Sequence, residues 1–131
     1  MLQGRTVTVK QLPETFFDRQ RSAFFSDVKG CLDVDRPCLV LDCSKLTQMD
    51  GRTIHLLLCC LEEAMKRNGD ARLAGVSPKV RAAMKTAGAD VLFRFFATCA
   101  EAVASFERRA DGFTRQGRES TNLLRNAKNV A

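Results

Sequence analysis

The fold is decided by residues 37–54, which read PCLVLDCSKLTQMDGRTI. Residues 37–43 form a nearly continuous apolar run of strand length, a pattern typical of strands that are buried on both faces of a sheet. Residues 44–49 are expected to form a loop. Asp50 then stands directly before a segment of helical periodicity, which makes it a good candidate for a helix N-cap. The stretch therefore predicts a buried strand, a loop and a capped helix in succession.

The helix after this loop is predicted over residues 51–67, because apolar side chains recur there at helical spacing. Asn68 and Gly69 end it. The stripe of this helix that we expect to be buried comprises Ile54, Leu57, Leu58, Leu61, Ala64 and Met65.

The rest of the chain continues the alternation of strands and helices. Upstream, we predict a strand over residues 5–10 and an amphipathic helix over residues 14–32. The elements predicted downstream are a strand over residues 71–76, a helix opened by Ser77 and Pro78 and ended by Gly88, a strand over residues 92–97, and a helix over residues 99–109. The side chains expected to be buried include Val40, Leu57, Leu61, Val76, Met84 and Val103. This order predicts an α/β fold, βαβαβαβα, with a mainly parallel or mixed sheet of about four strands packed with about four helices.

The composition is that of one globular domain. The chain has 131 residues, of which 45% are hydrophobic and 27% are charged, and this balance excludes a disordered chain, a collagen-like repeat and a coiled-coil rod. No apolar run approaches the roughly 18 residues of a membrane-spanning helix. Residues 1–9 lack the apolar core of a signal peptide. We therefore expect a cytoplasmic location.

The net charge of +6 is concentrated near the C-terminus. Residues 1–107 hold 15 Lys and Arg against 13 Asp and Glu, whereas residues 108–131 hold 6 against 2. The chain is therefore divided into a domain over residues 1–109 and a basic C-terminal tail over residues 110–131, with room for one short helix. A basic tail can touch nucleic acid or anionic lipid, but it is more often a solvated terminus. We do not expect a nucleic-acid partner.

Six cysteines and one histidine offer little for catalysis. The sequence has no C-x-x-C pair and its cysteines stand in apolar or strand-like surroundings, so we expect reduced thiols and no metal site. His55 and Cys59 stand four residues apart on a predicted helix and could pair as an imidazole and a thiolate. A thiol enzyme that uses Cys59 or Cys60 beside His55 is the least favoured alternative. Without a Walker loop or a G-x-G-x-x-G motif, we expect neither an enzyme nor a cofactor.

Five segments together resemble one known family. They are CLVLDCSKLTQMDGRTI (residues 38–54), LAGVSPKV (73–80), MKTAGA (84–89), FRFF (93–96) and AEAV (100–103). In this order and spacing they resemble the STAS domain of anti-sigma factor antagonists, over about residues 5–107. The resemblance implies that the α/β order is a STAS-like fold and that the chain is a protein-interaction regulator.

The loop at the second helix departs from the family pattern. In the anti-sigma factor antagonists that the chain resembles, a serine stands directly after the loop aspartate and is phosphorylated by a partner anti-sigma kinase. Here Asp50 is kept, but the acceptor position is Gly51, and Arg52 and Thr53 follow. Glycine has no hydroxyl, and Arg52 carries positive charge where a phosphate would bring negative charge. Two interpretations of the loop follow: it docks an acidic partner constitutively, or it has lost its function and is kept only as a helix cap. A third possibility is that the phosphorylation site has moved by two residues to Thr53.

The leading hypothesis is an interaction domain that binds an anti-sigma factor or a related serine-kinase-like regulator. The residues expected to bind the partner are Asp50, Gly51, Arg52, Thr53, His55, Glu62 and Lys66. The alternative is a STAS-like subunit of a lipid-transport ATP-binding-cassette complex, which docks onto an ATPase without phosphorylation. A homodimer is compatible with either hypothesis.

Overall fold

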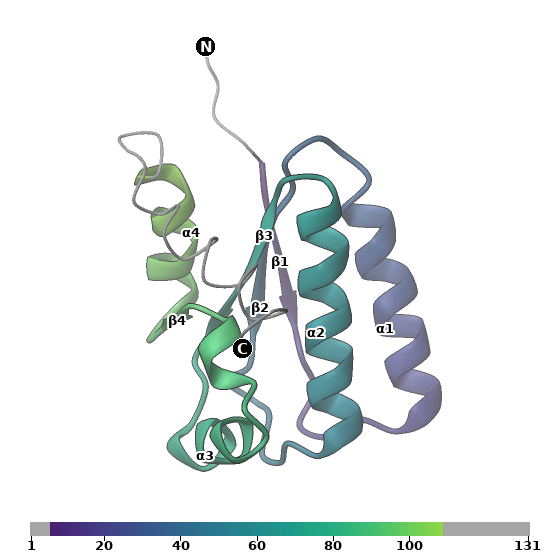
Figure 1. The fold of residues 1–131 in the computed structure, drawn as a ribbon, viewed down its shortest axis with the longest axis vertical. Coiled ribbons are helices and arrows are strands. Elements are labelled where there is room, and N and C mark those ends of the chain that lie inside the picture. The colour runs from purple at the N-terminus through teal and green to yellow at the C-terminus, as the bar shows by residue number, and fades with distance from the viewer. Residues whose placement is uncertain (1–5, 109–131) are drawn as a thin grey trace.

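The computed structural model describes residues 6–108 and shows strands alternating with helices (Figure 1). The strands are β1 (Val7–Gln11), β2 (Cys38–Asp42), β3 (Asp70–Ala74) and β4 (Phe95–Phe96). The helices are α1 (Asp18–Cys31), α2 (Gly51–Lys66), α3 (Pro78–Thr86) and α4 (Cys99–Arg108), with a 3-10 turn, η1 (Asp90–Leu92), between α3 and β4. The predicted basic tail over residues 110–131, including the short helix for which the sequence leaves room, lies outside the described residues.

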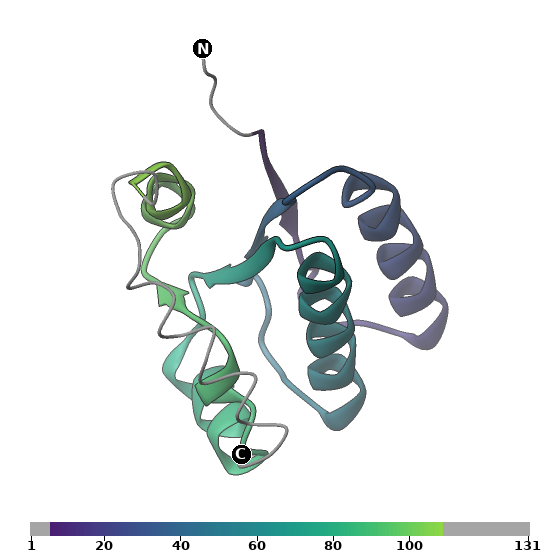
Figure 2. The ribbon, with the colours of Figure 1, turned by 45° about the horizontal axis from the view of Figure 1, so that its top comes forward.

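The strands form one parallel sheet in the order β1-β2-β3-β4. Each crossover moves one strand further in the same direction, so right-handed connections place the intervening helices on one face of the sheet. Helices α1 and α2 pack on that face, and α4, which follows the last strand, covers the opposite face (Figures 1 and 2). The predicted α/β order and largely parallel sheet are confirmed.

Strand β2 lies at the centre of the packing, as its apolar run predicts. Leu39 and Leu41 belong to the larger core, which includes residues of α1 and α2. Cys38 and Val40 belong to the smaller core on the other face, which includes residues of α4. Alternate side chains of one strand therefore bury themselves under different helices, which explains why the strand is apolar at nearly every position.

Arg72 of β3 is a buried charge that the sequence pattern does not reveal. Only 6% of the residue is exposed. Its guanidinium donates to Asp70 Oδ2 at 2.9 Å and to Ser105 Oγ at 2.7 Å, and its Cζ lies 3.9 Å from the ring centroid of Phe106. Because Ser105 and Phe106 belong to α4, these contacts of Arg72 hold that helix against the sheet.

Helix α1 begins at Asp18, later than the predicted start at residue 14. The backbone oxygen of Glu14 accepts two hydrogen bonds from Thr47 in the loop before α2, from N at 3.1 Å and from Oγ1 at 3.2 Å. These bonds hold the segment before α1 against the neighbouring loop. The helix therefore starts only after Phe17, whose N–H donates to Gln20 Oε1.

Strand β4 is shorter than the predicted strand over residues 92–97. Only Phe95 and Phe96 pair with β3, while Asp90–Leu92 form the turn η1. Phe93 is buried in the larger core, which draws the chain out of the plane of the sheet. At the C-terminal end of β4, the N–H of Ala97 donates to the Glu101 side chain of α4 instead of to strand β3.

Most of the expected buried positions are confirmed. The buried side chains among them are Val40, Leu57, Leu61 and Met84. Val76 and Val103 are half-buried instead. Val76 lies beyond the end of β3, and α4 turns Ala102 and Phe106 more directly towards the sheet than Val103. In α2, Leu58 and Met65 flank the buried stripe and are half-buried as well.

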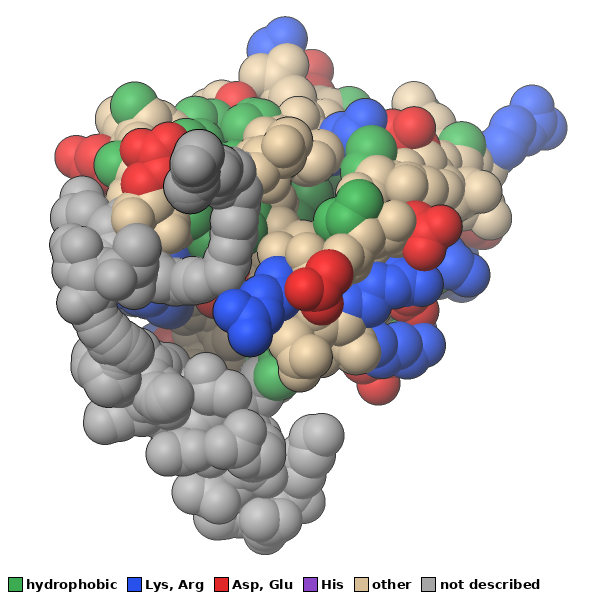
Figure 3. Space-filling model, turned by 90° about the horizontal axis from the view of Figure 1, so that it is seen from above, with side chains coloured by type: hydrophobic (Ala, Val, Ile, Leu, Met, Phe, Trp, Pro, Cys, Tyr) green, Lys and Arg blue, Asp and Glu red, His purple; other side chains and the backbone are tan. Residues whose placement is uncertain are grey.

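The cysteines are divided between the interior and its margins. Cys38, Cys43 and Cys60 are buried, and the other three are half-buried. None of the helices within residues 6–108 has the length and apolar character needed to cross a membrane. On the face seen in Figure 3, basic and acidic side chains are intermixed and form no extended patch of one sign.

Candidate partner-binding site

Asp50 caps α2, as the sequence predicts. Its carboxylate accepts a hydrogen bond from the Thr53 N–H at 2.8 Å. This bond to Thr53 lowers the pKa of Asp50 below its ordinary value, because it stabilises the ionised carboxylate. The cap satisfies one of the free N–H groups of the first turn and fixes the direction in which the helix leaves the loop.

Gly51 and Thr53 differ sharply in exposure. A Cβ added at Gly51 would have no heavy atom within 4 Å, and this glycine does not adopt a positive φ. A serine would therefore fit at position 51 and present its hydroxyl to solvent. Thr53, by contrast, is only 3% exposed. A kinase would reach the Thr53 hydroxyl only if the first turn of α2 opened.

Arg52 is held by α1. Its Nη1 donates to Oδ1 of Asp18 at 2.7 Å, and Arg21 also forms an ion pair with the Asp18 carboxylate. Hydrogen bonds from Arg52 and then Arg21 lower the pKa of Asp18 below its ordinary value. Arg52 remains 70% exposed, so a partner can still contact it. It is, however, not the unpaired positive charge that the sequence suggests.

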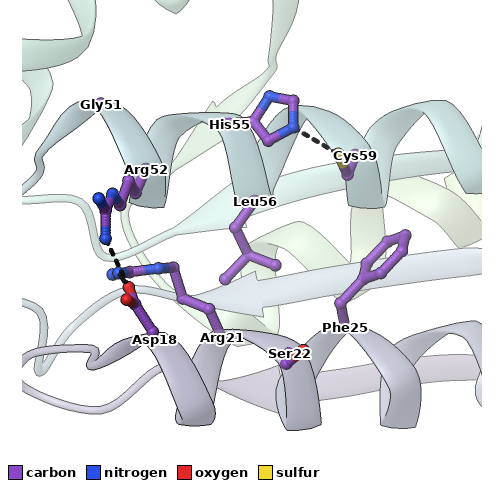
Figure 4. A pocket seen from close by; sticks show the side chains of 9 residues that line it. All are labelled: Asp18, Arg21, Ser22, Phe25, Gly51, Arg52, His55, Leu56 and Cys59. Carbon is purple, nitrogen blue, oxygen red and sulfur yellow. Dashed lines mark hydrogen bonds and ion pairs between the residues drawn. The ribbon is translucent and has the colours of Figure 1, made fainter.

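A shallow groove runs between α1 and α2 beside this ion pair (Figure 4). It encloses about 530 Å³, and its lining includes Phe25 of α1 and Leu56 of α2. Arg52 and His55 line it on the α2 side, and Asp18 and Arg21 line it on the α1 side. The groove therefore combines apolar side chains with a charged end.

The other residues expected to bind a partner lie further along α2. Glu62 is exposed, and Lys66 is paired with Glu63 at 2.9 Å. This bond to Glu63 raises the pKa of Lys66. Arg52, His55, Glu62 and Lys66 follow one another at helical spacing on the same face of α2. At 1.5 Å per residue, that face extends about 21 Å from position 52 to position 66.

His55 and Cys59 form the contact that their spacing suggests. Cys59 Sγ lies 3.4 Å from His55 Nε2. Burial raises the pKa of the Cys59 thiol, and the nearby carboxylates of Glu62 and Glu63 raise it further. A nucleophilic cysteine needs a lowered pKa, so this arrangement opposes the thiol-enzyme alternative.

Sequence reasoning missed the contribution of α1. Asp18 pairs both with Arg21 on its own helix and with Arg52, which lies 34 residues further along the chain, and Phe25 lines the groove. Phe17, which directly precedes Asp18, is 69% exposed and adds an apolar side chain beside that end of α1. The only signal in the sequence was the amphipathic pattern of this helix, which indicates burial and not a pairing partner.

The fold is that of a small α/β domain of the STAS type. The chain matches the family described as the STAS domain over residues 4–102. The protein belongs to this family, whose members are usually non-catalytic regulators. No curated protein matches the chain.

Solved structures show the same fold at low sequence identity. An anti-sigma-factor antagonist (STAS) domain protein from Planctomyces limnophilus is 17% identical with a TM-score of 0.69, and the match covers 77% of this chain and 91% of that one. The anti-sigma factor antagonist SpoIIAA in its unphosphorylated form is 19% identical with a TM-score of 0.66, covering 88% and 96%. A sulfate transporter family protein from Wolinella succinogenes is 22% identical with a TM-score of 0.64, covering 81% and 88%.

Proposed function

We propose that this STAS domain is a non-enzymatic interaction module that binds an anti-sigma factor or a related serine-kinase-like regulator. The partner docks on the exposed face of α2 and on the groove between α1 and α2. The observation that carries the proposal is the placement of this groove directly beside the N-terminus of α2. In the anti-sigma factor antagonists that the chain resembles, this helix end carries the regulatory serine.

The groove suits a protein partner better than a small substrate. It is open to solvent, and Phe25 and Leu56 supply an apolar floor on which an inserted side chain can be desolvated. Arg52 and Arg21 flank the single carboxylate of Asp18 at its end. Two guanidinium groups against one carboxylate leave a net positive charge, which suits an acidic group on the partner.

The partner is bound without control by phosphorylation at the family position. Gly51 offers no hydroxyl there, and the Thr53 hydroxyl is buried. A phosphate in the family loop adds about −1.5 to −2 units of charge at the helix N-terminus. Arg52 holds the opposite charge at this place in every state of the protein, so docking is constitutive.

Gly51 also favours a second candidate function. A STAS-like subunit of a lipid-transport ATP-binding-cassette complex docks onto its ATPase without needing a phosphorylated serine. The same face of α2 would then contact the ATPase. The two candidates differ in the partner and agree on the surface.

Site-specific photo-crosslinking tests the surface and identifies the partner together. A photoreactive residue is introduced at position 52 or at position 62, and a matched control carries it at position 101, an exposed position of α4 on the opposite face of the sheet. We expect adducts with a kinase-like regulator from positions 52 and 62 only, identified by mass spectrometry. An ATPase of a transporter complex in those adducts would select the second candidate. Adducts from position 101 alone would contradict the proposed surface.

A phosphorylation assay on a variant with a serine at position 51 distinguishes a kinase-like partner from a transporter ATPase. Gly51→Ser places a hydroxyl in open space at the start of α2. If the crosslinked partner is a serine-kinase-like regulator, it should transfer phosphate from ATP to Gly51→Ser and not to the native chain or to Gly51→Ala. A native chain that is phosphorylated on Thr53 would contradict constitutive docking.

A further inference from the structure

The chain's single histidine and a half-buried cysteine meet on the exposed side of α2 (Figure 4). His55 Nε2 and Cys59 Sγ are 3.4 Å apart, one helical turn from each other. We propose that His55 and Cys59 form a two-donor binding site for a thiophilic divalent cation of the Zn²⁺ class. The proposal goes beyond the proposed function, because it concerns a metal ion that this chain would bind without any protein partner.

The separation of the two donor atoms fits one metal ion. Zinc binds a cysteine sulfur at about 2.3 Å and a histidine nitrogen at about 2.0–2.1 Å. With a tetrahedral angle at the metal, these two bond lengths place sulfur and nitrogen about 3.5 Å apart. The observed 3.4 Å between Sγ and Nε2 is close to that value. Both donors can therefore bind one ion with little change of rotamer.

The site is open to an incoming ion. His55 and Cys59 both line the groove between α1 and α2, so solvent reaches both side chains. Arg52, one turn earlier on α2, points away from the pair and towards Asp18 of α1 (Figure 4). The nearest carboxylates along α2 are Glu62 and Glu63, which act on Cys59 through their charge. Their negative charge favours a cation beside the thiol, and the two arginines of the groove, Arg21 and Arg52, are paired with Asp18 at its other end.

The two donors leave the ion's coordination sphere incomplete. Within residues 6–108, no group of three or more His, Cys, Asp or Glu side chains could hold a metal. Zinc is usually four-coordinate, so water takes the remaining positions in the isolated protein. Binding replaces the S–H bond of Cys59 by a sulfur–metal bond and releases the proton to solvent. This site differs from the expectation, drawn from cysteine spacing, that the chain holds no metal.

Cobalt(II) is a suitable probe, because its bond to a thiolate gives an intense near-ultraviolet charge-transfer band. The purified full chain, reduced with a phosphine, is titrated with Co²⁺ and then with Zn²⁺. We expect the band to grow to saturation with Co²⁺ and to disappear as Zn²⁺ displaces it. The band should be lost in His55→Ala and in Cys59→Ser, each of which removes one donor.

Two further variants make the result specific. Cys99→Ser is the matched control, because Cys99 is also half-buried and lies beside the Asp42 carboxylate, and it should keep the band. The double variant His55→Cys with Cys59→His exchanges the donors at the same spacing and should recover the band that either single variant loses. Persistence of the band in His55→Ala or in Cys59→Ser would overturn the proposal, and so would a native chain that shows no band or an exchanged pair that fails to recover it.

Discussion

The guanidinium of Arg52 donates from Nη1 to Oδ1 of Asp18 at 2.7 Å, although the two residues lie 34 positions apart in the sequence. This hydrogen bond joins the first turn of α2 to the first turn of α1. This contact changes what is expected of Arg52. Taken alone, an arginine in the first turn of a helix is mildly opposed by the helix dipole. The sequence therefore predicts that Arg52→Glu leaves folding intact or slightly improves it. With Asp18 opposite, the substitution would bring two carboxylates together.

Arg52→Glu should therefore lower the melting temperature slightly, whereas Arg52→Gln should leave it nearly unchanged. The loss is small because the pair is exposed and solvent screens it. Binding to the partner identified by crosslinking should weaken by about 1–3 kcal/mol in Arg52→Glu, if the contact is desolvated. Scanning calorimetry and a titration of the partner measure the two effects.

A charge exchange separates folding from docking. Asp18→Lys combined with Arg52→Glu restores an ion pair of opposite polarity between positions 18 and 52, so the melting temperature should rise above that of Arg52→Glu alone. The recovery is partial, because Asp18→Lys also removes the ion pair with Arg21. The partner should still bind weakly, because position 52 now carries negative charge. Full recovery of binding in this double variant would mean that Arg52 only joins the two helices.

The cap of α2 gives a prediction that depends on pH. Asp50→Ala should destabilise the fold by about 1 kcal/mol, since it leaves the Thr53 N–H without its acceptor. The folded pKa of Asp50 is lowered from 3.8, so the ionised form is favoured by folding. This contribution is complete above the unfolded value and is lost as the pH falls below it, through the lower folded value.

Urea denaturation of the native chain and of Asp50→Ala over a range of pH checks this prediction. The difference in unfolding free energy should be constant near neutrality and should shrink in strong acid. Asp50→Ser retains a side-chain acceptor and should keep most of the stability. A difference that does not depend on pH would mean that the charge of the cap is irrelevant.

The buried guanidinium of Arg72 makes Ser105 important for stability. Ser105→Ala removes the oxygen that accepts from Arg72 Nη1 at 2.7 Å and leaves part of a buried charge unsatisfied. We expect a loss of about 1–3 kcal/mol in the unfolding free energy. Thr86→Ala removes an exposed hydroxyl that bonds only within its own helix and should change the stability little. Equal effects of the two variants would contradict the anchoring role of Arg72.

The adjacent thiols of Cys59 and Cys60 in α2 should differ in their rate of alkylation. Cys60 is buried, and burial raises its pKa to about 12, whereas Cys59 is half-buried with a smaller increase. Because the thiolate is the reactive form, alkylation of the native protein near pH 8 should modify Cys59 well before Cys60. Peptide mass spectrometry after timed alkylation measures both rates. The same experiment tests whether all six thiols are reduced, since a cysteine in a disulfide would stay unmodified even in denaturant.

The boundary of the domain is also open to a direct test. We propose that residues 1–109 fold without residues 110–131, because the tail is basic and carries few apolar side chains before Leu123 and Leu124. Removing residues 110–131 should shift the melting midpoint by a few degrees at most. A large loss would mean that Leu123 and Leu124 pack against the domain.

The sequence by itself determined the class of fold and most of the core. The apolar run of β2, the cap at Asp50 and the helical stripe through Leu57 and Leu61 depend on short-range periodicity, and the structure has each of them. Such patterns hold because a strand buried on both faces and a helix buried on one face need apolar residues at fixed spacings. Element boundaries were less certain wherever a loop competed for the backbone, as the bonds between Glu14 and Thr47 do before α1.

Only the tertiary structure decided what surrounds the N-terminus of α2. The pairing of Arg52 with Asp18, the groove that runs from Phe25 to Leu56 and the burial of Arg72 against α4 all join residues that are distant in sequence. No local pattern encodes such contacts, because a charged residue looks the same in the sequence whether it faces solvent or a partner on another helix. The path of the chain places α1 beside α2, and that placement turns a solvent-facing arginine into one member of an ion pair at the end of a groove.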